Sequence, residues 1–165
     1  MNGVWVRHFH DMTDSPTIHA SAVLIGAKAV LIRGPSGAGK SQLAWQLILA
    51  AAGNALPFAR LVADDRAHVE AASDRLLVRP APSLAGLIEI RGFGIRTLAY
   101  EGLAAVGFVV DLAATDAARL PTHEAENTVI SGICLPRLPV TSGINALPLV
   151  LAWLGTAAAT AQSGN

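Results

Sequence analysis

The chain has 165 residues and a net formal charge of zero, with 52% apolar and 15% charged residues. That length suits one domain with a sizeable core, and the interspersed charges exclude the basic surface that a nucleic-acid partner requires. The longest apolar stretches, 43–52 and 146–154, are shorter than the ~20 residues that span a bilayer, and no signal-peptide pattern opens the sequence. We therefore expect a cytoplasmic protein without a membrane partner, whose apolar surplus predicts contacts between subunits.

Two regions are distinguished by composition. Residues 1–16 are polar and mixed, which predicts a flexible leader, and residues 17–161 are expected to form a single domain. His8 and His10 in the leader have the spacing of a chelating pair on a strand, but two histidines in such a segment are a weak metal signal. The one cysteine, Cys134, cannot form an internal disulfide and is interpreted as a small buried apolar residue.

Most of the chain consists of short β-prone runs separated by turn residues. In chain order, the predicted strands cover residues 22–25, 29–32, 61–63, 68–71, 76–78, 87–90, 106–112 and 133–140. The first two form a hairpin around Gly26-Ala27-Lys28, and a second hairpin turns at Ser73-Asp74. One helix is predicted over 40–52, with Gly53 as its stop, and a closing helix over 145–161.

Two of these strands carry more specific signals. The run 106–112 is almost continuously apolar, as expected for a strand buried on both faces. The run 133–140 contains Pro136 and Pro139, which confine it to a sheet edge or an extended segment. The stretch 111–126 is the most polar of the chain and is expected to be a surface loop.

A phosphate-binding motif lies between the second strand and the first helix. The pattern G-x-x-x-x-G-K-[ST] is matched in full by Gly34, Pro35, Ser36, Gly37, Ala38, Gly39, Lys40 and Ser41. Glycines let successive backbone N–H groups turn toward anionic oxygens, and the following helix directs its positive end at the same place. Lys40 is expected to contact the outer phosphates and Ser41 to bind Mg²⁺. We call residues 34–41 the phosphate cradle, and it predicts a nucleotide-binding protein.

Three acids could complete a site around the cradle. Asp64 and Asp65 follow a buried strand, where a P-loop protein places its second magnesium ligand. Two adjacent carboxylates suggest divided labour, one near the metal and one as general base, although a solvated strand end followed by Arg66 is the alternative. Glu89 alternates with Ile88 and Ile90, so it is either solvent-facing or a ligand.

The order of these features resembles the catalytic domain of HPr kinase/phosphorylase, which phosphorylates a serine of the phosphocarrier HPr. The matching segments run from about Thr17 to Leu154 and are Ile18-His19-Ala20, Gly34 to Ser41, Leu61 to Arg66, Ile88 to Ile95 and Pro139 to Asn145. The resemblance implies an α/β fold of the HPr kinase and PEP-carboxykinase type, with a P-loop core, a mixed sheet and hairpins. It also implies ATP and Mg²⁺ as cofactors, HPr as partner, and a hexamer.

The resemblance also assigns roles to side chains. Lys40 would neutralise the β- and γ-phosphates, Asp65 would take the proton of the seryl hydroxyl, and His19 would assist it. Magnesium would be bound by Ser41, Glu89 and the neighbouring Asp64. Arg119 aligns with the family's catalytic arginine, and the sequence leaves open whether it acts in its own subunit or a neighbour's. In the family's second reaction, inorganic phosphate would attack seryl phosphate and release pyrophosphate, and the same acid would return its proton to the serine oxygen.

Two departures from the family pattern are visible. We expect a short leader in place of the N-terminal domain that many members carry, as in the compact form of alphaproteobacteria. The usual Pro-Gly-Arg-Asn tract reads Ser142-Gly143-Ile144-Asn145, and an aliphatic side chain cannot hold a phosphate as a guanidinium does. We therefore expect kinase activity with weakened phosphorolysis. The alternatives are a P-loop kinase of a small metabolite and a nucleotide-sensing module without catalysis.

Overall fold

A computed structural model describes residues 16–156 of the chain. Its elements are β1 (Thr17–Ile18), β2 (Ala20–Ile25), β3 (Lys28–Arg33), α1 (Lys40–Ala52), β4 (Ala59–Ala63), β5 (Ala67–Ala72), β6 (Arg75–Pro80), η2 (Pro82–Leu84), β7 (Leu87–Ile90), β8 (Gly94–Thr97), β9 (Ala104–Leu112), β10 (Asn127–Ile130), β11 (Ile133–Val140) and α2 (Ala146–Gly155). The predicted leader, with His8 and His10, lies outside the described residues apart from Pro16. None of the helices in the described part is long and apolar enough to cross a membrane.

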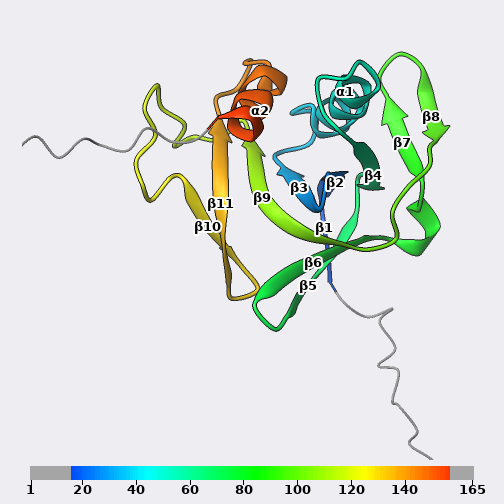
Figure 1. The fold of residues 1–165 in the computed structure, drawn as a ribbon, viewed down its shortest axis with the longest axis horizontal. Helices are drawn as coiled ribbons and strands as arrows, with labels where there is room; N and C mark the ends of the chain where they lie inside the picture. Colours follow the sequence, from blue (N-terminus) through cyan, green and yellow to red (C-terminus); the bar gives the residue numbers. More distant parts are fainter. Residues whose placement is uncertain (1–15, 157–165) are drawn as a thin grey trace, which may run out of the picture.

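A mixed, curled sheet of nine strands forms the centre of the fold (Figure 1). Strand β3 pairs in parallel with β9, and β9 pairs in parallel with β11, whereas β2 is antiparallel to both β3 and β4. Strands β3, β4, β9 and β11 therefore all run in the same direction. Their carboxyl ends meet at one edge of the sheet, where an open α/β sheet binds its ligands.

Two apolar cores lie on the two faces of the central strands. On one face, Leu43 and Leu47 of α1 and Val150 of α2 pack over Ile32 and Val110. On the other face, the β5–β6 hairpin covers a second core made mainly of alanine, valine and leucine side chains. With both faces covered, β9 is buried along most of its length, as its apolar sequence predicts.

The strand and helix predictions are confirmed for most elements. Helix α1 spans the predicted residues 40–52 and ends at Gly53, whose N–H donates to the Leu49 carbonyl over 2.9 Å. Both predicted hairpins form, as β2–β3 and β5–β6. In β11 the first half pairs only with β10 and the second half only with β9. Each half is thus an edge on one side, which explains how Pro136 and Pro139 are accommodated.

Three expectations were wrong or incomplete. The closing helix ends at Gly155 rather than at residue 161, because Thr156 is extended and its hydroxyl caps the Ala152 carbonyl over 2.6 Å. Cys134 is exposed rather than buried, since it alternates with the buried Leu135 along β11 and so faces the opposite side. The strand at 87–90 was predicted, but its partner β8, with which it forms a separate two-stranded sheet, was not.

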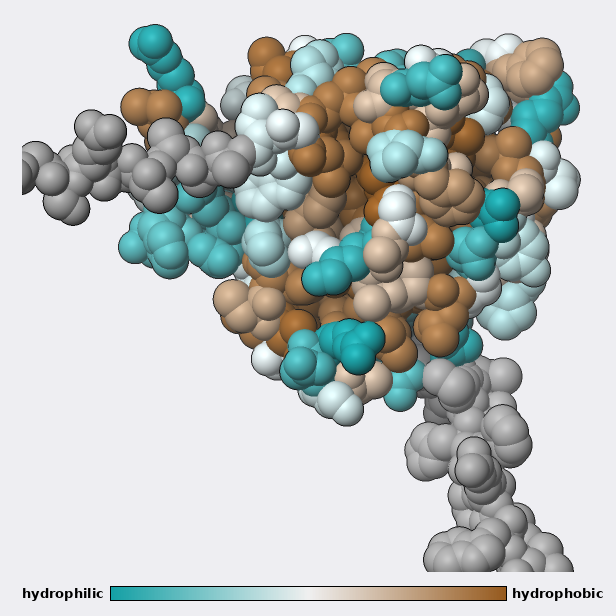
Figure 2. Space-filling view, in the orientation of Figure 1, coloured by the Kyte–Doolittle hydropathy of each residue, from teal (hydrophilic) through white to brown (hydrophobic). Residues whose placement is uncertain are grey.

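The predicted apolar surplus is visible on the surface. A broad apolar area, interrupted by scattered hydrophilic residues, covers the face seen in Figure 2. Large apolar side chains that are at least half exposed are Phe93, Ile95, Leu103, Leu120, Val129 and Ile144. Exposed apolar area of this kind is typical of interaction surfaces.

Candidate active site

The phosphate cradle leaves the carboxyl end of β3 and continues directly into α1. Gly39 precedes the helix with φ 98°, a left-handed conformation that side chains disfavour. Gly34 has φ 150°, and a Cβ at that position would lie 2.9 Å from the Leu112 carbonyl oxygen of the adjacent strand. The loop can therefore take this course only with glycine at these two positions.

Lys40 lies at the first position of α1 and points back along the cradle. Its Nζ donates to the carbonyls of Gly34 and Pro35, each over 2.9 Å, and the residue is only 6% exposed. Burial lowers the pKa of Lys40 from its ordinary value, although the charges of Asp65 and Asp64 act in the opposite direction. A buried ammonium group beside the turned backbone of the loop favours an anion with several oxygens, such as a polyphosphate.

Asp64 is a buried hub beneath the cradle, only 4% exposed. Its Oδ1 accepts hydrogen bonds from Ser21 Oγ at 2.6 Å and from Ser41 Oγ at 2.8 Å. Its Oδ2 accepts the Glu89 backbone N–H at 3.1 Å. One carboxylate thus joins β2, α1 and β7. Because Ser41 donates its proton to Asp64, the lone pairs of the Ser41 hydroxyl remain available to a cation.

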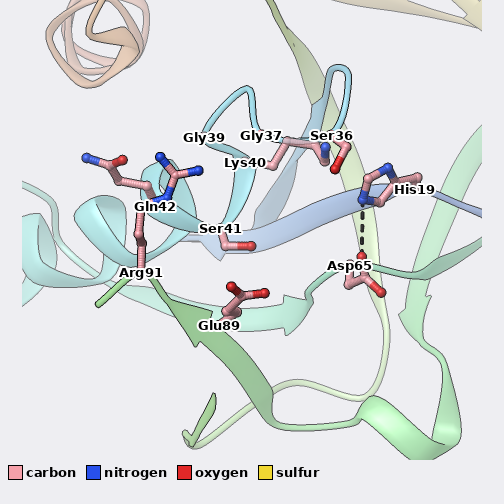
Figure 3. Close-up of a pocket in the computed structure, with 10 residues that line it drawn as sticks. All are labelled: His19, Ser36, Gly37, Gly39, Lys40, Ser41, Gln42, Asp65, Glu89 and Arg91. Atoms are coloured by element: carbon pink, nitrogen blue, oxygen red, sulfur yellow. Dashed lines mark ion pairs between the residues drawn. The ribbon is translucent and has the colours of Figure 1, made fainter. Parts of the chain in front are cut away.

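Asp65 differs from Asp64 in its backbone conformation, its exposure and its contacts. Its backbone has φ 64°, and this turn directs the side chain outward, where it is 63% exposed. Its Oδ1 lies 3.1 Å from Nε2 of His19 (Figure 3). A non-glycine residue in the left-handed region costs on the order of 1 kcal/mol and is frequent at functional sites. The reading of both acids as a solvated strand end is wrong for Asp64 and is not favoured by the pairing of Asp65.

A pocket of about 250 Å³ gathers most of the predicted site residues (Figure 3). We call it the charged pocket, and its lining residues are His19, Ser36, Gly37, Gly39, Lys40, Ser41, Gln42, Asp65, Glu89 and Arg91. Glu89 is exposed toward this space, on the same side as the Ser41 hydroxyl. The side chain of Glu89 is therefore exposed to solvent and also lies where it could bind a metal ion, so the two predictions for it do not exclude each other.

The donor set for a metal is small. Among residues 16–156, no cluster of three or more His, Cys, Asp or Glu side chains could hold an ion by itself. Ser41, Asp64 and Glu89 supply oxygen atoms only, which suits Mg²⁺, an ion that keeps several waters and binds one or two carboxylates plus substrate phosphates. The chain therefore fits a magnesium ion that arrives with a polyphosphate.

Among the predicted site residues outside the cradle, Asp64 contacts the charged pocket through Ser41 and Glu89, whereas Arg119, in the described part of the chain, neither lines this pocket nor bonds to a residue that does. It is exposed on the loop after β9 and lines none of the pockets around the cradle. That loop is anchored by Arg137, which donates to Asp116 over 2.6 and 2.9 Å and also contacts Asp111. The role implied for Arg119 stays a prediction.

Two functional candidates were missed by the sequence reasoning. Arg91 lines the charged pocket from the turn directly after β7, and its charge two residues after Glu89 was the available signal. Ser21 is fully buried, and a serine within the apolar run 20–25 indicated a buried polar partner.

Comparisons with known proteins agree with this arrangement. A family model described as the HPr Serine kinase C-terminal domain matches residues 10–152. The HPr kinase/phosphorylase of Exiguobacterium sp. is 32% identical over 160 residues, covering 88% of this chain and 49% of the relative. That of Streptococcus pneumoniae is 34% identical over 148 residues, covering 81% of this chain and 45% of the relative. The chain thus spans about half the length of these curated relatives.

A solved structure supports the predicted fold. The Hpr(Ser) kinase/phosphatase from Coxiella burnetii aligns with a TM-score of 0.66 and 25% identity, covering 85% of this chain and 88% of the other. This similarity confirms the expected mixed α/β fold with a P-loop core. Because the family model also matches well over half of the sequence, the chain belongs to the HPr serine kinase C-terminal domain family.

Proposed function

We propose that this chain is a catalytic domain that transfers the γ-phosphoryl group of ATP to a serine of the phosphocarrier HPr. The observation that carries the proposal is the pairing of a complete phosphate cradle with Asp65, an exposed carboxylate in the same pocket. The relatives that cover most of this chain are named HPr kinase/phosphorylase. We place the protein in the cytoplasm, where ATP and such carriers are available.

The residues of the cradle would hold the nucleotide. Backbone N–H groups of residues 34–39 and the ammonium group of Lys40 would bind the outer phosphates. Ser41 and Glu89, which lie on the same side of the charged pocket, would both contact Mg²⁺, and Asp64 would fix the Ser41 hydroxyl through the 2.8 Å hydrogen bond. When bound, the ion would neutralise charge on the transferring phosphoryl group.

Asp65 would act as the general base. Its carboxylate is exposed to the pocket and would accept the proton of the attacking seryl hydroxyl. His19, 3.1 Å away, would orient the carboxylate. Lys40 would stabilise the charge that develops on the phosphoryl oxygens. In phosphorolysis, inorganic phosphate would attack the phosphorus of seryl phosphate, so that pyrophosphate forms as the bond to the seryl oxygen breaks, and the protonated Asp65 would give its proton to that oxygen.

Phosphorolysis is proposed to be the weaker reaction. Ile144 is 57% exposed beside the cradle, at the place where the family pattern carries an arginine. It offers no charge to a second phosphate group. Purified protein assayed in both directions should therefore turn over seryl-phosphate HPr much more slowly than it phosphorylates HPr. Equal turnover would contradict this part of the proposal.

Arg119 is proposed to act on the active site of a neighbouring subunit, within a hexamer. Arg119 is exposed and does not line its own charged pocket, which supports this arrangement, and the exposed apolar surface could support the contacts. Mixing Arg119→Ala subunits with Asp65→Asn subunits, each inactive alone, should restore part of the activity, because some sites would then combine both intact residues. No recovery in mixed oligomers would exclude action between subunits.

The proposed reaction is tested with purified chain, Mg-ATP and HPr, by measuring the intact mass and the phosphosite of HPr. We expect one phosphate on a serine, absent with Asp65→Asn and retained with Asp74→Asn, an exposed aspartate in the β5–β6 turn. ATP binding without transfer would favour the small-metabolite kinase or the nucleotide sensor. Transfer that survives Asp65→Asn would exclude Asp65 as the base.

A further inference from the structure

A second pocket lies on the other side of the phosphate cradle. We call it the neutral pocket; its volume is about 380 Å³, and its lining residues are Ala38, Gly39, Gln42, Leu43, Gln46, Leu112, Gly143, Ile144, Asn145 and Ala146. A smaller adjoining pocket of about 200 Å³ shares Ala38, Leu112, Gly143 and Ile144 with it. The combined space is large enough for a small organic group.

The lining of the neutral pocket differs in chemistry from that of the charged pocket. It includes no charged side chain, whereas the charged pocket has Lys40, Arg91, Asp65 and Glu89. Its walls are aliphatic, with the buried Leu112 facing the cradle side and Ile144, 57% exposed, at the mouth. A phosphate group would find no counter-charge here, but an uncharged planar ring could bury its faces.

Three carboxamides supply the polar groups of the neutral pocket. Within residues 16–156, the side chains of Gln42 and Gln46 take part in no hydrogen bond. The Asn145 Oδ1 accepts the Leu147 N–H at 3.1 Å, which leaves its NH₂ group free to donate. Carboxamides offer donors and acceptors together, the pattern that the edge of a nucleobase requires.

The two pockets are connected through the cradle. Gly39 and Gln42 line both of them, so one ligand can reach from one pocket into the other. The neutral pocket is built by three segments: the end of the cradle with the first turns of α1, the last residue of β9, and the residues that follow β11. The last two lie at the carboxyl ends of strands that run parallel to β3. A triphosphate held by residues 34–41 would therefore extend the rest of its molecule toward these segments.

We infer that the neutral pocket is the nucleobase subsite of the triphosphate bound at the cradle. Ile144 and Leu112 enclose the ring faces, and Gln42, Gln46 and Asn145 contact the ring edge. This inference rests on the proposed use of ATP, but it concerns binding and not transfer. It also gives Ile144 a role of its own, as part of an apolar wall.

The test is the dissociation constant of the full chain for Mg-ATP and for Mg-tripolyphosphate, measured by isothermal titration calorimetry. Because tripolyphosphate has neither base nor sugar, its dissociation constant measures binding at the phosphate cradle alone. We expect ATP to bind at least tenfold more tightly, and Ile144→Asn to remove about fivefold of that preference while changing tripolyphosphate binding less than twofold. Val129→Asn, an exposed apolar position on β10, is the matched control and should change neither.

Two results would overturn the inference. One is equal affinity for ATP and tripolyphosphate, and the other is an Ile144→Asn variant that weakens both ligands alike or neither. Both results are independent of the proposed kinase activity, since they require no acceptor. A protein that prefers ATP through Ile144 but fails to phosphorylate HPr would retain the subsite and lose the proposed function.

Discussion

Replacing Ser21 with alanine should destabilise the protein and weaken its response to magnesium. The Ser21 hydroxyl is fully buried and donates to Asp64 Oδ1 over 2.6 Å. A hydrogen bond to a charged partner contributes about 1.5–3 kcal/mol. Alanine leaves only a very small void, so the loss of the hydrogen bond dominates. Because Asp64 keeps its bonds from Ser41 and the Glu89 N–H, we expect about 2 kcal/mol, near the middle of that range.

The assay is urea unfolding of Ser21→Ala, with Ser83→Ala as the control. Ser83 is exposed in the short helix η2, so its replacement should change the free energy of unfolding by less than about 0.5 kcal/mol. A looser Asp64 would also orient Ser41 less well, so the Mg²⁺ concentration for half-maximal ATP binding should rise. If Ser21→Ala unfolds at the same urea concentration as Ser83→Ala, the hydrogen bond from Ser21 to Asp64 does not make the expected contribution to the free energy of unfolding.

Three further perturbations test other parts of the site. Asp65→Asn should keep its affinity for ATP in calorimetry but lose about 10²–10⁴-fold in transfer rate, the usual contribution of a positioned base. Burial alone would raise the pKa of Asp111, but hydrogen bonds from two arginines, one of them Arg137, outweigh it and hold that pKa below its ordinary value. Asp111 thus stabilises the fold at neutral pH, and this contribution is lost as the pH falls below about 4. In Asp111→Asn, the free energy of unfolding should therefore depend less on pH in this acid range. An unchanged pH dependence would contradict the stabilising role of the two arginines at Asp111. Gly34→Ala would place its Cβ 2.9 Å from the Leu112 carbonyl oxygen, and it should lower the melting temperature and abolish ATP binding, whereas near-native binding would contradict the tight course of the loop.

Local signals explain why much of the fold could be predicted. Helix α1 begins at the end of a recognised loop and stops at Gly53, and both hairpin turns carry residues that favour them. Strand β8 gave no such signal, because all of Gly94–Thr97 is exposed and lacks alternation. The end of α2 was missed since apolar, helix-favouring residues continue in the sequence, while the Thr156 cap depends on a contact within the folded helix.

The sequence predicted which residues form most of the candidate site, but not how their side chains are arranged. The motif located Lys40 and Ser41, and the acids after the buried strand were expected nearby. What the sequence could not provide was the opposite burial of Asp64 and Asp65, which depends on one left-handed backbone conformation. Nor could it bring Ser21 to Asp64, a contact across 43 residues of chain. Such long-range contacts arise only when the sheet is assembled.

The hydrogen bonds of the two acids support their division of labour. A general base must present a free lone pair to the incoming hydroxyl, and Asp64 has both of its oxygens engaged by donors from β2, α1 and β7. Within residues 16–156, the Asp65 carboxylate pairs only with His19, and it is otherwise open to the pocket. The same chain geometry that commits one acid to structure therefore leaves its neighbour available for proton transfer.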